Sequence, residues 1–263
     1  MIALPKRYII ALIIGTVISG VAVILYQSMD TYNQLDERYV QLKTGKAEEI
    51  VLINLGNADR AAIAQTISRI GQCEPRLLVI DFLFREFNGD AADSALLRAI
   101  DKHRVLLPSK NGGQGTFGID QNFQQAAADV GFTDIGISKD GRNLVTDVNL
   151  YYDLNGRRDY HLAHKIVSRI DPVAAHNFDM TVKNPIVDVV ITRLSSQFET
   201  LDYRDELICD ILKDKLVIAG YLGPGDEDKF RTYATYRDDV EGSGKDMYGP
   251  VVLANQVLMV MGR

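Results

Sequence analysis

Three apolar segments rich in β-branched residues constrain the fold most strongly. They are EIVLINLG at 49–56, RLLVIDFLF at 76–84 and RVLLPS at 104–109. Strands with such unbroken apolar runs are buried on both faces of a sheet. Amphipathic helical patterns separate them: Ile63, Ile67 and Ile70 share one face of the first, and the second contains SALLRAIDKH. This alternation predicts a mostly parallel sheet covered by helices on both faces.

Capping and turn residues delimit these elements. Asn57 is expected to cap the first helix, and either Asp90 or Asp93 the second, because short polar side chains accept hydrogen bonds from the first free N–H groups. From Gly131 onward, apolar and polar residues alternate around KDGR and NGRR turns, which predicts an antiparallel meander. The predicted fold class is α/β, with a mixed, largely parallel sheet, flanking helices and an antiparallel meander.

An uncharged apolar run at residues 8–26 sets the expected location of the chain. About 20 such residues span a bilayer as a helix. Lys6 and Arg7 precede the run, and acidic residues dominate the segment that follows it, so the positive-inside rule puts the N-terminus in the cytoplasm. The predicted organisation is a cytoplasmic N-terminus at 1–7, a single transmembrane helix at 8–26, a helical linker at 27–48 and an extracytoplasmic domain at 49–263.

A cleaved signal peptide is the alternative interpretation of the same run, since Gly20 and Ala22 supply small residues at a spacing that cleavage needs. The apolar core of a signal peptide usually runs only about 7–15 residues, and this run is longer, which favours an uncleaved anchor. Within it, Gly15 and Ser19 form a small-residue pair that would let two such helices pack as a homodimer.

Charge and cysteine content narrow the class of protein. The formal net charge is −6, and no basic stretch interleaved with aromatic residues occurs, so the sequence predicts no nucleic-acid partner. Cys73 and Cys209 are the two cysteines. They either form one disulfide in an oxidising compartment or remain separate buried thiols, and the sequence leaves both alternatives open.

Two further patterns suggest cofactor or metal binding but are better explained otherwise. GQGTFG at 113–118 fits the dinucleotide fingerprint, yet polar glycine-rich residues precede it and the first strand lacks it, so a flexible loop is expected. His161 and His164 lie three apart with only Asp159 as a nearby carboxylate, and are expected on the surface of a helix. Because no catalytic motif is present either, the sequence predicts no catalytic residue and no cofactor.

An ordered series of motifs resembles the type 2 CHASE domain, an extracellular sensor of bacterial receptors. The series is EIVLINL, LLVIDFLF, GF with KDG, DILKDKLVIAGYLG, DKFRTY and YGPVVLANQVL, and it spans residue 49 to the C-terminus. The positions that match the family pattern are Asp81, Phe84, Gly220, Asp228, Phe230, Thr232, Gly249, Ala254 and Asn255. Tyr233 replaces a usual proline, Leu253 replaces a histidine and Arg142 is displaced, which is typical of a divergent member.

The resemblance implies a membrane-anchored sensory domain that binds a small-molecule or envelope ligand and takes part in signal transduction. In such receptors, further transmembrane helices lead to a cytoplasmic cyclase, kinase or phosphodiesterase. The residues leave two other functions open: an extracytoplasmic hydrolase of unrecognised type, and a structural envelope protein.

The candidate site lies where apolar strands end in carboxylates. Asp81 ends the second strand, where α/β folds place ligand-binding groups, and a structural cap for the loop at 85–90 is the alternative role that the sequence leaves open. We expect one ligand site, formed by Asp81, Asp228, Thr232 and Asn255. Asp226, Glu227 and Asp228 are candidate ligands of a hard cation such as calcium, with solvated charge as the alternative. The terminal helix at 250–261 is expected to pack on the sheet, close to residues 26–39.

Overall fold

The structure, a computed structural model, describes residue 39 and the ranges 41–111, 116–138, 144–154, 157–225, 228–233 and 247–263. Across these residues, no helix combines the length and the apolar character that crossing a bilayer requires. The predicted transmembrane run at 8–26 lies outside them. Of the predicted linker at 27–48, the structure describes Tyr39, which is helical, and residues 41–48, which are not. The linker therefore remains a prediction.

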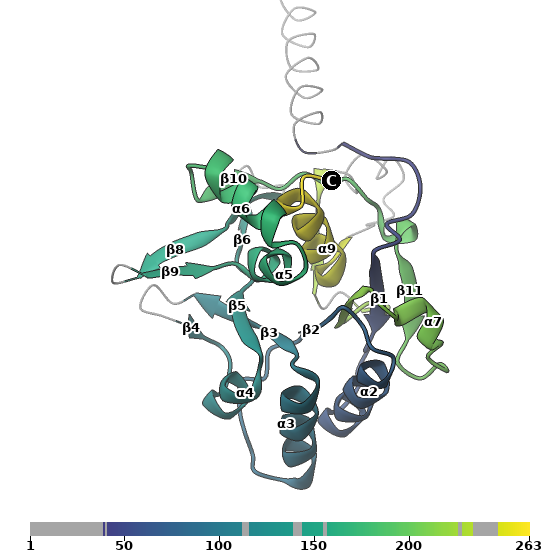
Figure 1. Ribbon diagram of the computed structural model, residues 1–263. Helices are drawn as coiled ribbons and strands as arrows, with labels where there is room; N and C mark the ends of the chain where they lie inside the picture. Colours follow the sequence, from purple (N-terminus) through teal and green to yellow (C-terminus); the bar gives the residue numbers. More distant parts are fainter. Residues whose placement is uncertain are drawn as a thin grey trace, which may run out of the picture.

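A parallel sheet forms the centre of the molecule (Figure 1). Its strand order is β11–β1–β12–β2–β3–β5, and all of these neighbours pair in parallel. The strands are β1 (Ile50–Asn54), β2 (Leu77–Asp81), β3 (Leu106–Asn111), β5 (Asp129–Phe132), β11 (Glu199–Asp202) and β12 (Leu216–Gly220). The short strand β4 (Thr116–Phe117) pairs antiparallel with β3. The predicted largely parallel sheet is therefore confirmed.

Alternate side chains of the central strands enter two separate hydrophobic cores. Leu52, Val79 and Ile218 point into one core, while their neighbours Ile53 and Ile80 point into the other. This division explains the unbroken apolar runs of the sequence, because both faces of these strands are covered.

The first core lies under α2 (Arg60–Gln72), α3 (Ala91–His103), α4 (Gln121–Ala126) and α7 (Cys209–Leu212). Asp59, and not the expected Asn57, caps α2 by accepting a hydrogen bond from the Ala62 N–H at 2.8 Å. The capping residue is two positions later because Asn57 belongs to the loop that leaves β1. Asp90, one of the two expected candidates, caps α3.

The opposite core lies under α5 (Leu162–Ile170) and α9 (Gly249–Val260), with α6 (Pro172–Thr181) packed against both helices. Every residue of α9 except Met259 is buried. A helix that is apolar around its whole circumference must be enclosed by other elements. The terminal helix therefore packs against the core, as its sequence predicts.

Antiparallel pairs form smaller sheets beside this core. They are β10–β7–β6, with bounds Ile186–Asp188, Val145–Asn149 and Ile135–Ile137, then β8 (Tyr151–Leu154) with β9 (Arg157–Tyr160), and β13 (Lys229–Phe230) with β14 (Met247–Tyr248). The predicted meander begins later than expected. Gly131 and Phe132 belong to β5 of the parallel sheet, because they pair with Pro108 and Ser109 of β3.

Cys73 and Cys209 form a disulfide, which decides between the two alternatives that the sequence leaves open. The bond joins the end of α2 to the first residue of α7 across 136 residues of sequence. Disulfides persist mainly in oxidising compartments, so this bond is consistent with a domain outside the cytoplasm.

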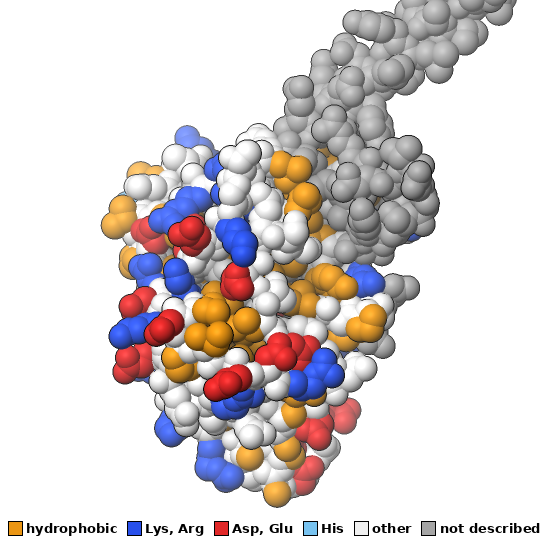
Figure 2. Space-filling view, turned by 90° about the vertical axis from the view of Figure 1, so that its right-hand side faces the viewer, with side chains coloured by type: hydrophobic (Ala, Val, Ile, Leu, Met, Phe, Trp, Pro, Cys, Tyr) orange, Lys and Arg blue, Asp and Glu red, His pale blue; other side chains and the backbone are white. Residues whose placement is uncertain are grey.

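The surface carries charges of both signs. Figure 2 shows one face on which Lys and Arg side chains are interspersed with Asp and Glu, and hydrophobic side chains gather in several patches between them. On this face, the described residues form no continuous field of one sign.

Candidate ligand site

Three adjacent strands end at the same level, and the last residue of one of them, Asp81, lines the candidate site. Asn54 of β1 is in register with Gly220 of β12, which is in register with Asp81 of β2. Asn54 fastens the loops above this edge: its Oδ1 accepts hydrogen bonds from the N–H groups of Gly56 and Leu222, both at 2.9 Å. The edge is thus a rigid platform for Asp81.

Gly220 allows the start of α9 to approach this platform. A Cβ atom on Gly220 would lie 2.5 Å from Cγ of Pro250 and 3.3 Å from Cβ of Asp81. Such contacts are too short for a side chain larger than hydrogen. The glycine therefore determines how closely α9 packs beside Asp81.

Gly249 has the same role for Asp228. A Cβ atom on Gly249 would lie 2.3 Å from Oδ2 of Asp228, so the carboxylate occupies the space that a side chain would fill. Asp228 has a left-handed backbone (φ 60°), which aspartate tolerates better than most residues, and its carbonyl accepts a hydrogen bond from the Gly249 N–H at 2.9 Å. These contacts direct the Asp228 carboxylate toward the helix start.

Asp81 and Asp228 line one cavity of about 430 Å³. Its walls come from the carboxyl ends of β1, β2, β3, β5 and β12, from β6 and β13, and from the first turns of α9. The lining residues are Gly56, Asn57, Ala58, Asp81, Phe82, Leu83, Pro108, Lys110, Thr133, Ile135, Tyr221, Asp228, Phe230, Gly249, Val252, Leu253 and Gln256. Most of this surface is apolar, and a few polar groups converge on it, which is typical of small-molecule sites.

The two carboxylates of the cavity, Asp81 and Asp228, both have pKa values raised above the usual range. Burial, and to a lesser degree the charge of Asp228, raises the pKa of Asp81 to about 7, against the opposing effect of Lys110. Burial also raises the pKa of Asp228 to about 6, again opposed by Lys110. Asp228 as a whole residue is exposed, but its carboxylate is tucked against Gly249, which accounts for this desolvation.

No described residue forms a hydrogen bond or an ion pair with the Asp81 carboxylate. The residue is half-buried, and its side chain opens onto the cavity. The one cation in the lining, Lys110, has its Nζ 3.6 Å from Oδ1 of Asp134. Since an unpaired buried carboxylate is costly, its retention at a cavity wall is a feature of binding sites more than of loop caps.

The other predicted site residues have different surroundings. Thr232 is buried and does not line the cavity. Asn255 is buried inside α9, and its side chain binds the backbone of a neighbouring segment: Oδ1 accepts from the Thr192 N–H at 2.8 Å and the Arg193 N–H at 2.9 Å, and Nδ2 donates to the Arg193 carbonyl at 3.0 Å. The structure thus brings Asp81 and Asp228 together, but not Thr232 or Asn255.

Among the predicted metal ligands, Asp226 and Glu227 lie outside the described residues. The described part of the chain holds no cluster of three His, Cys, Asp or Glu side chains that could bind a metal ion. The predicted calcium site therefore remains a prediction.

Lys110 and Gln256 line the cavity but are not among the residues that the sequence predicts for the site. Lys110 follows Pro108 by two positions at the end of β3, so it shares the cavity side of the sheet. Gln256 follows Asn255 in an otherwise apolar helix, and a polar residue within such an apolar run is the signal that would have identified Gln256.

The sequence matches the model of one known protein family. A family model described as the CHASE2 domain matches residues 11–262, which is nearly the whole chain. The chain belongs to the CHASE2 domain family. This confirms the resemblance that the ordered motifs indicate, and CHASE2 domains are extracellular sensory domains of signal-transduction proteins. No curated protein and no solved structure matches the chain.

In this CHASE2 domain, Asn255 links α9 indirectly, through residues 191–193, to Tyr39, Gln41 and Lys43. The backbone around Thr192, whose N–H Asn255 binds, also forms hydrogen bonds with the chain near Tyr39. The Ile191 N–H donates to the Tyr39 carbonyl at 2.9 Å, and the Lys43 N–H donates to the Thr192 carbonyl at 3.0 Å. The ring of Tyr39 also stacks on Tyr233, with centroids 4.6 Å apart. Tyr39 and residues 41–43 are therefore hydrogen-bonded to the segment that Asn255 of α9 holds.

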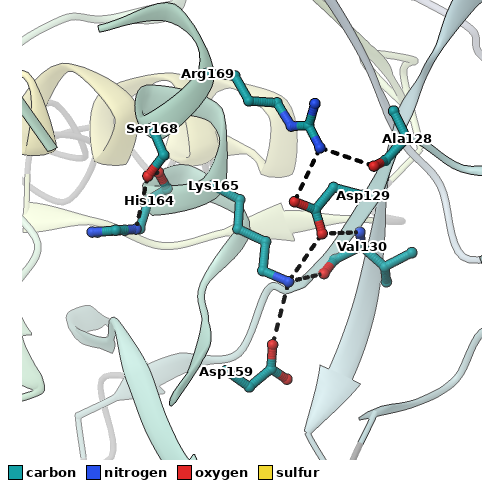
Figure 3. Close-up of polar contacts among 8 residues, drawn as sticks. All are labelled: Ala128, Asp129, Val130, Asp159, His164, Lys165, Ser168 and Arg169. Atoms are coloured by element: carbon teal, nitrogen blue, oxygen red, sulfur yellow. Dashed lines mark hydrogen bonds and ion pairs between the residues drawn. The ribbon is translucent and has the colours of Figure 1, made fainter. Parts of the chain in front are cut away.

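A second hollow of the CHASE2 domain, about 1010 Å³, lies over α5 and is lined largely by polar and charged side chains. Figure 3 shows the polar contacts among eight of its lining residues. Lys165 bridges Asp129 at 3.2 Å and Asp159 at 3.3 Å, and Arg169 contacts Asp129 and the Ala128 carbonyl at 3.3 and 2.9 Å. These cations are already paired with carboxylates or a carbonyl. The network ties α5 to β5 and β9 and is structural.

The predicted surface position of His161 and His164 is wrong, because both side chains are buried. His161 caps α5, and its Nδ1 accepts from the Ala163 N–H at 3.1 Å. His164 is covered by α6 and by the ring of Tyr160, which stacks on it at 4.2 Å. Burial lowers the pKa of both histidines, to about 3 for His161.

His164 also lies between Ser168 and Asp179, an arrangement that superficially resembles a hydrolase triad. Its Nε2 is 2.9 Å from Oδ1 of Asp179, and its Nδ1 is 3.3 Å from Oγ of Ser168. However, the Ser168 hydroxyl donates to the His164 carbonyl at 2.9 Å, one turn earlier in the same helix. The hydroxyl proton is directed to the backbone, so this geometry does not activate a nucleophile.

Proposed function

We propose that the chain is the ligand-binding sensory domain of a bacterial signal-transduction protein, anchored in the membrane by residues 8–26 with its main domain outside the cytoplasm. Membership of the CHASE2 family and the Cys73–Cys209 disulfide support this proposal. The proposal assigns ligand binding to the cavity at the carboxyl edge of the sheet.

One observation carries the assignment: the Asp81 carboxylate opens onto a largely apolar cavity and has no partner among the described residues. A carboxylate in such surroundings is destabilising for the folded protein unless a ligand or water compensates it. Perturbed carboxylates in a cavity are therefore a physical sign of function. The neighbouring Asp228 carboxylate strengthens that sign.

The same geometry provides a route for the signal. Val252, Leu253 and Gln256 form part of the cavity wall, and the adjacent Asn255 holds residues 192–193. Thr192 and the preceding Ile191 are in turn hydrogen-bonded to Tyr39, Gln41 and Lys43. If α9 can adopt two placements relative to the sheet, a ligand that binds more tightly to one of them will increase the population of that placement. The shift then reaches the segment that leads from the predicted membrane helix.

The test is thermal stabilisation of the full-length chain by a varied set of cationic, neutral and anionic small molecules. A true ligand will raise the melting temperature saturably, and the effect will be lost in the double variant Asp81→Asn with Asp228→Asn. Asp101→Asn, on the exposed surface of α3, is the matched control and will respond like the wild type.

Hydrogen exchange then tests the signal route. A ligand found in this way should change the exchange rates of the Lys43 and Ile191 amides, which form the ladder beside Asn255. If every stabilising compound acts equally on the wild type and the double variant, the cavity is not the ligand site and the proposal fails.

A further inference from the structure

We infer that the cavity takes a small organic ammonium ion with an apolar body and one hydrogen-bond acceptor. This inference rests on the proposed function, which assigns the cavity to ligand binding and leaves the chemistry of the ligand open. Three features of the lining argue for this class: its charge, its apolar surface and one unpaired amide.

The charge of the lining favours a cation. Two carboxylates, Asp81 and Asp228, face the cavity, and the one lysine in the lining, Lys110, is shared with Asp134 at 3.6 Å. A ligand with a positive charge would give Asp81 the partner that the described protein residues do not supply. An anionic ligand would instead have to approach both carboxylates, which repels it.

The apolar surface distinguishes an organic cation from a metal ion. Calcium requires six to eight oxygen ligands, and magnesium retains several waters. This cavity offers two carboxylates among Leu83, Ile135 and Phe230, and its apolar side chains cannot coordinate a metal. An ammonium group needs fewer partners, and its carbon skeleton gains free energy by displacing water from such side chains.

Aromatic rings add to this preference. Phe82 and Tyr221 line the cavity, and Phe82 is 40% exposed, so its ring borders an opening. Ring faces attract organic cations, an effect that grows where water is excluded. The volume of about 430 Å³ lies within the range of small-molecule sites.

Gln256 supplies the third feature. Its side chain lines the cavity and is 2% exposed, and its Nε2 has no hydrogen-bond partner among the described residues. An unpaired buried amide is costly. A rotation of the amide about its last bond presents Nε2 to the cavity, where a hydroxyl or carbonyl oxygen of the ligand can accept from it.

The experiment compares four probes of similar size on the full-length chain: L-phenylalaninol, 2-phenylethylamine, 3-phenylpropan-1-ol and 3-phenylpropionate. The first carries an ammonium and a hydroxyl, and the second and third each lack one of them. The fourth carries a negative charge. Alkylammonium groups remain protonated near pH 8. The readout is the saturable shift in melting temperature, from which an apparent Kd is obtained.

L-phenylalaninol is expected to bind most tightly, with 2-phenylethylamine several-fold weaker and 3-phenylpropan-1-ol at least about tenfold weaker, because hydrogen bonds to charged groups are the stronger ones. Binding should weaken toward pH 5 as Asp81 and Asp228 take up protons. Asp81→Asn should abolish the preference for the ammonium. Lys110→Met, which keeps the aliphatic stem and removes the competing charge, should strengthen ammonium binding.

Different failures have different meanings. If 3-phenylpropionate binds best, or if 3-phenylpropan-1-ol matches L-phenylalaninol, the ligand class is wrong while the cavity remains a ligand site. If none of the four probes gives a saturable response, the ligand class is again overturned. The proposed function fails separately, when no compound in the wider set acts through Asp81 and Asp228.

Discussion

Replacing Asp81 by asparagine should make the domain more stable in mildly alkaline solution. The structure places this carboxylate against a cavity without a partner among the described residues, and its pKa is raised from 3.8 to about 7. Asparagine has nearly the same shape and resembles the protonated acid. The substitution therefore removes the cost of ionisation with little change in packing.

The sign and the size follow from proton linkage. Between about pH 4 and pH 7, the folded protein holds a proton on Asp81 that the unfolded chain has released, so the stability of the wild type falls as the pH rises through this window and levels off above it. At about 1.4 kcal/mol per pKa unit, the change from 3.8 to about 7 corresponds to ~4 kcal/mol as an upper limit. Water in the cavity screens the charge, which reduces the expected effect to about 2 kcal/mol.

The assay is thermal or urea unfolding of the full-length chain at several pH values from about 4 to 8. Near pH 8, Asp81→Asn should melt about 4–8 °C above the wild type, the shift that 2 kcal/mol produces in a domain of this size. Near pH 4 the two should coincide. Asp101→Asn serves as the control because that side chain is exposed. A wild type and an Asp81→Asn variant with the same pH dependence would refute the reasoning, since the carboxylate would then be compensated.

Three further predictions concern other parts of the chain. Asn255→Leu should destabilise the domain by about 2–4 kcal/mol in urea unfolding, because it leaves the Thr192 and Arg193 N–H groups without partners; a loss below about 1 kcal/mol would contradict this. Gly249→Ala should displace the Asp228 carboxylate and weaken ligand binding more than it weakens folding, measured by comparing apparent Kd with melting temperature. A topology reporter fused after Gly45 should be active only outside the cytoplasm, and cytoplasmic activity would overturn the predicted orientation.

Much of the fold could be predicted from local pattern. The apolar runs at 49–56 and 76–84 became β1 and β2, and the isoleucines of the intervening helix became its buried face. The start of the meander was misjudged because alternation is weak in the residues around Gly131, which join the parallel sheet through contacts with β3. The helix caps were predicted to within two residues.

The candidate site was only partly predictable. Asp81 could be located because it ends an apolar strand, and Asp228 because it belongs to a family motif. Asn255 shares that motif, yet its side chain supports the backbone of residues 192–193. A motif records that a residue type is needed and does not distinguish ligand contact from structural support, since both select for a particular polar side chain.

The sequence by itself determined the fold class, the presence of strand-end carboxylates and the family, because these depend on periodicity and on the order of short motifs. Only the tertiary structure decided that β12 lies between β1 and β2, which sets Gly220 beside Asp81. It also decided that Cys73 is bonded to Cys209 and that α6 buries His164. These outcomes join segments far apart in the chain, and the packing that selects them is a property of the whole core that no local pattern encodes.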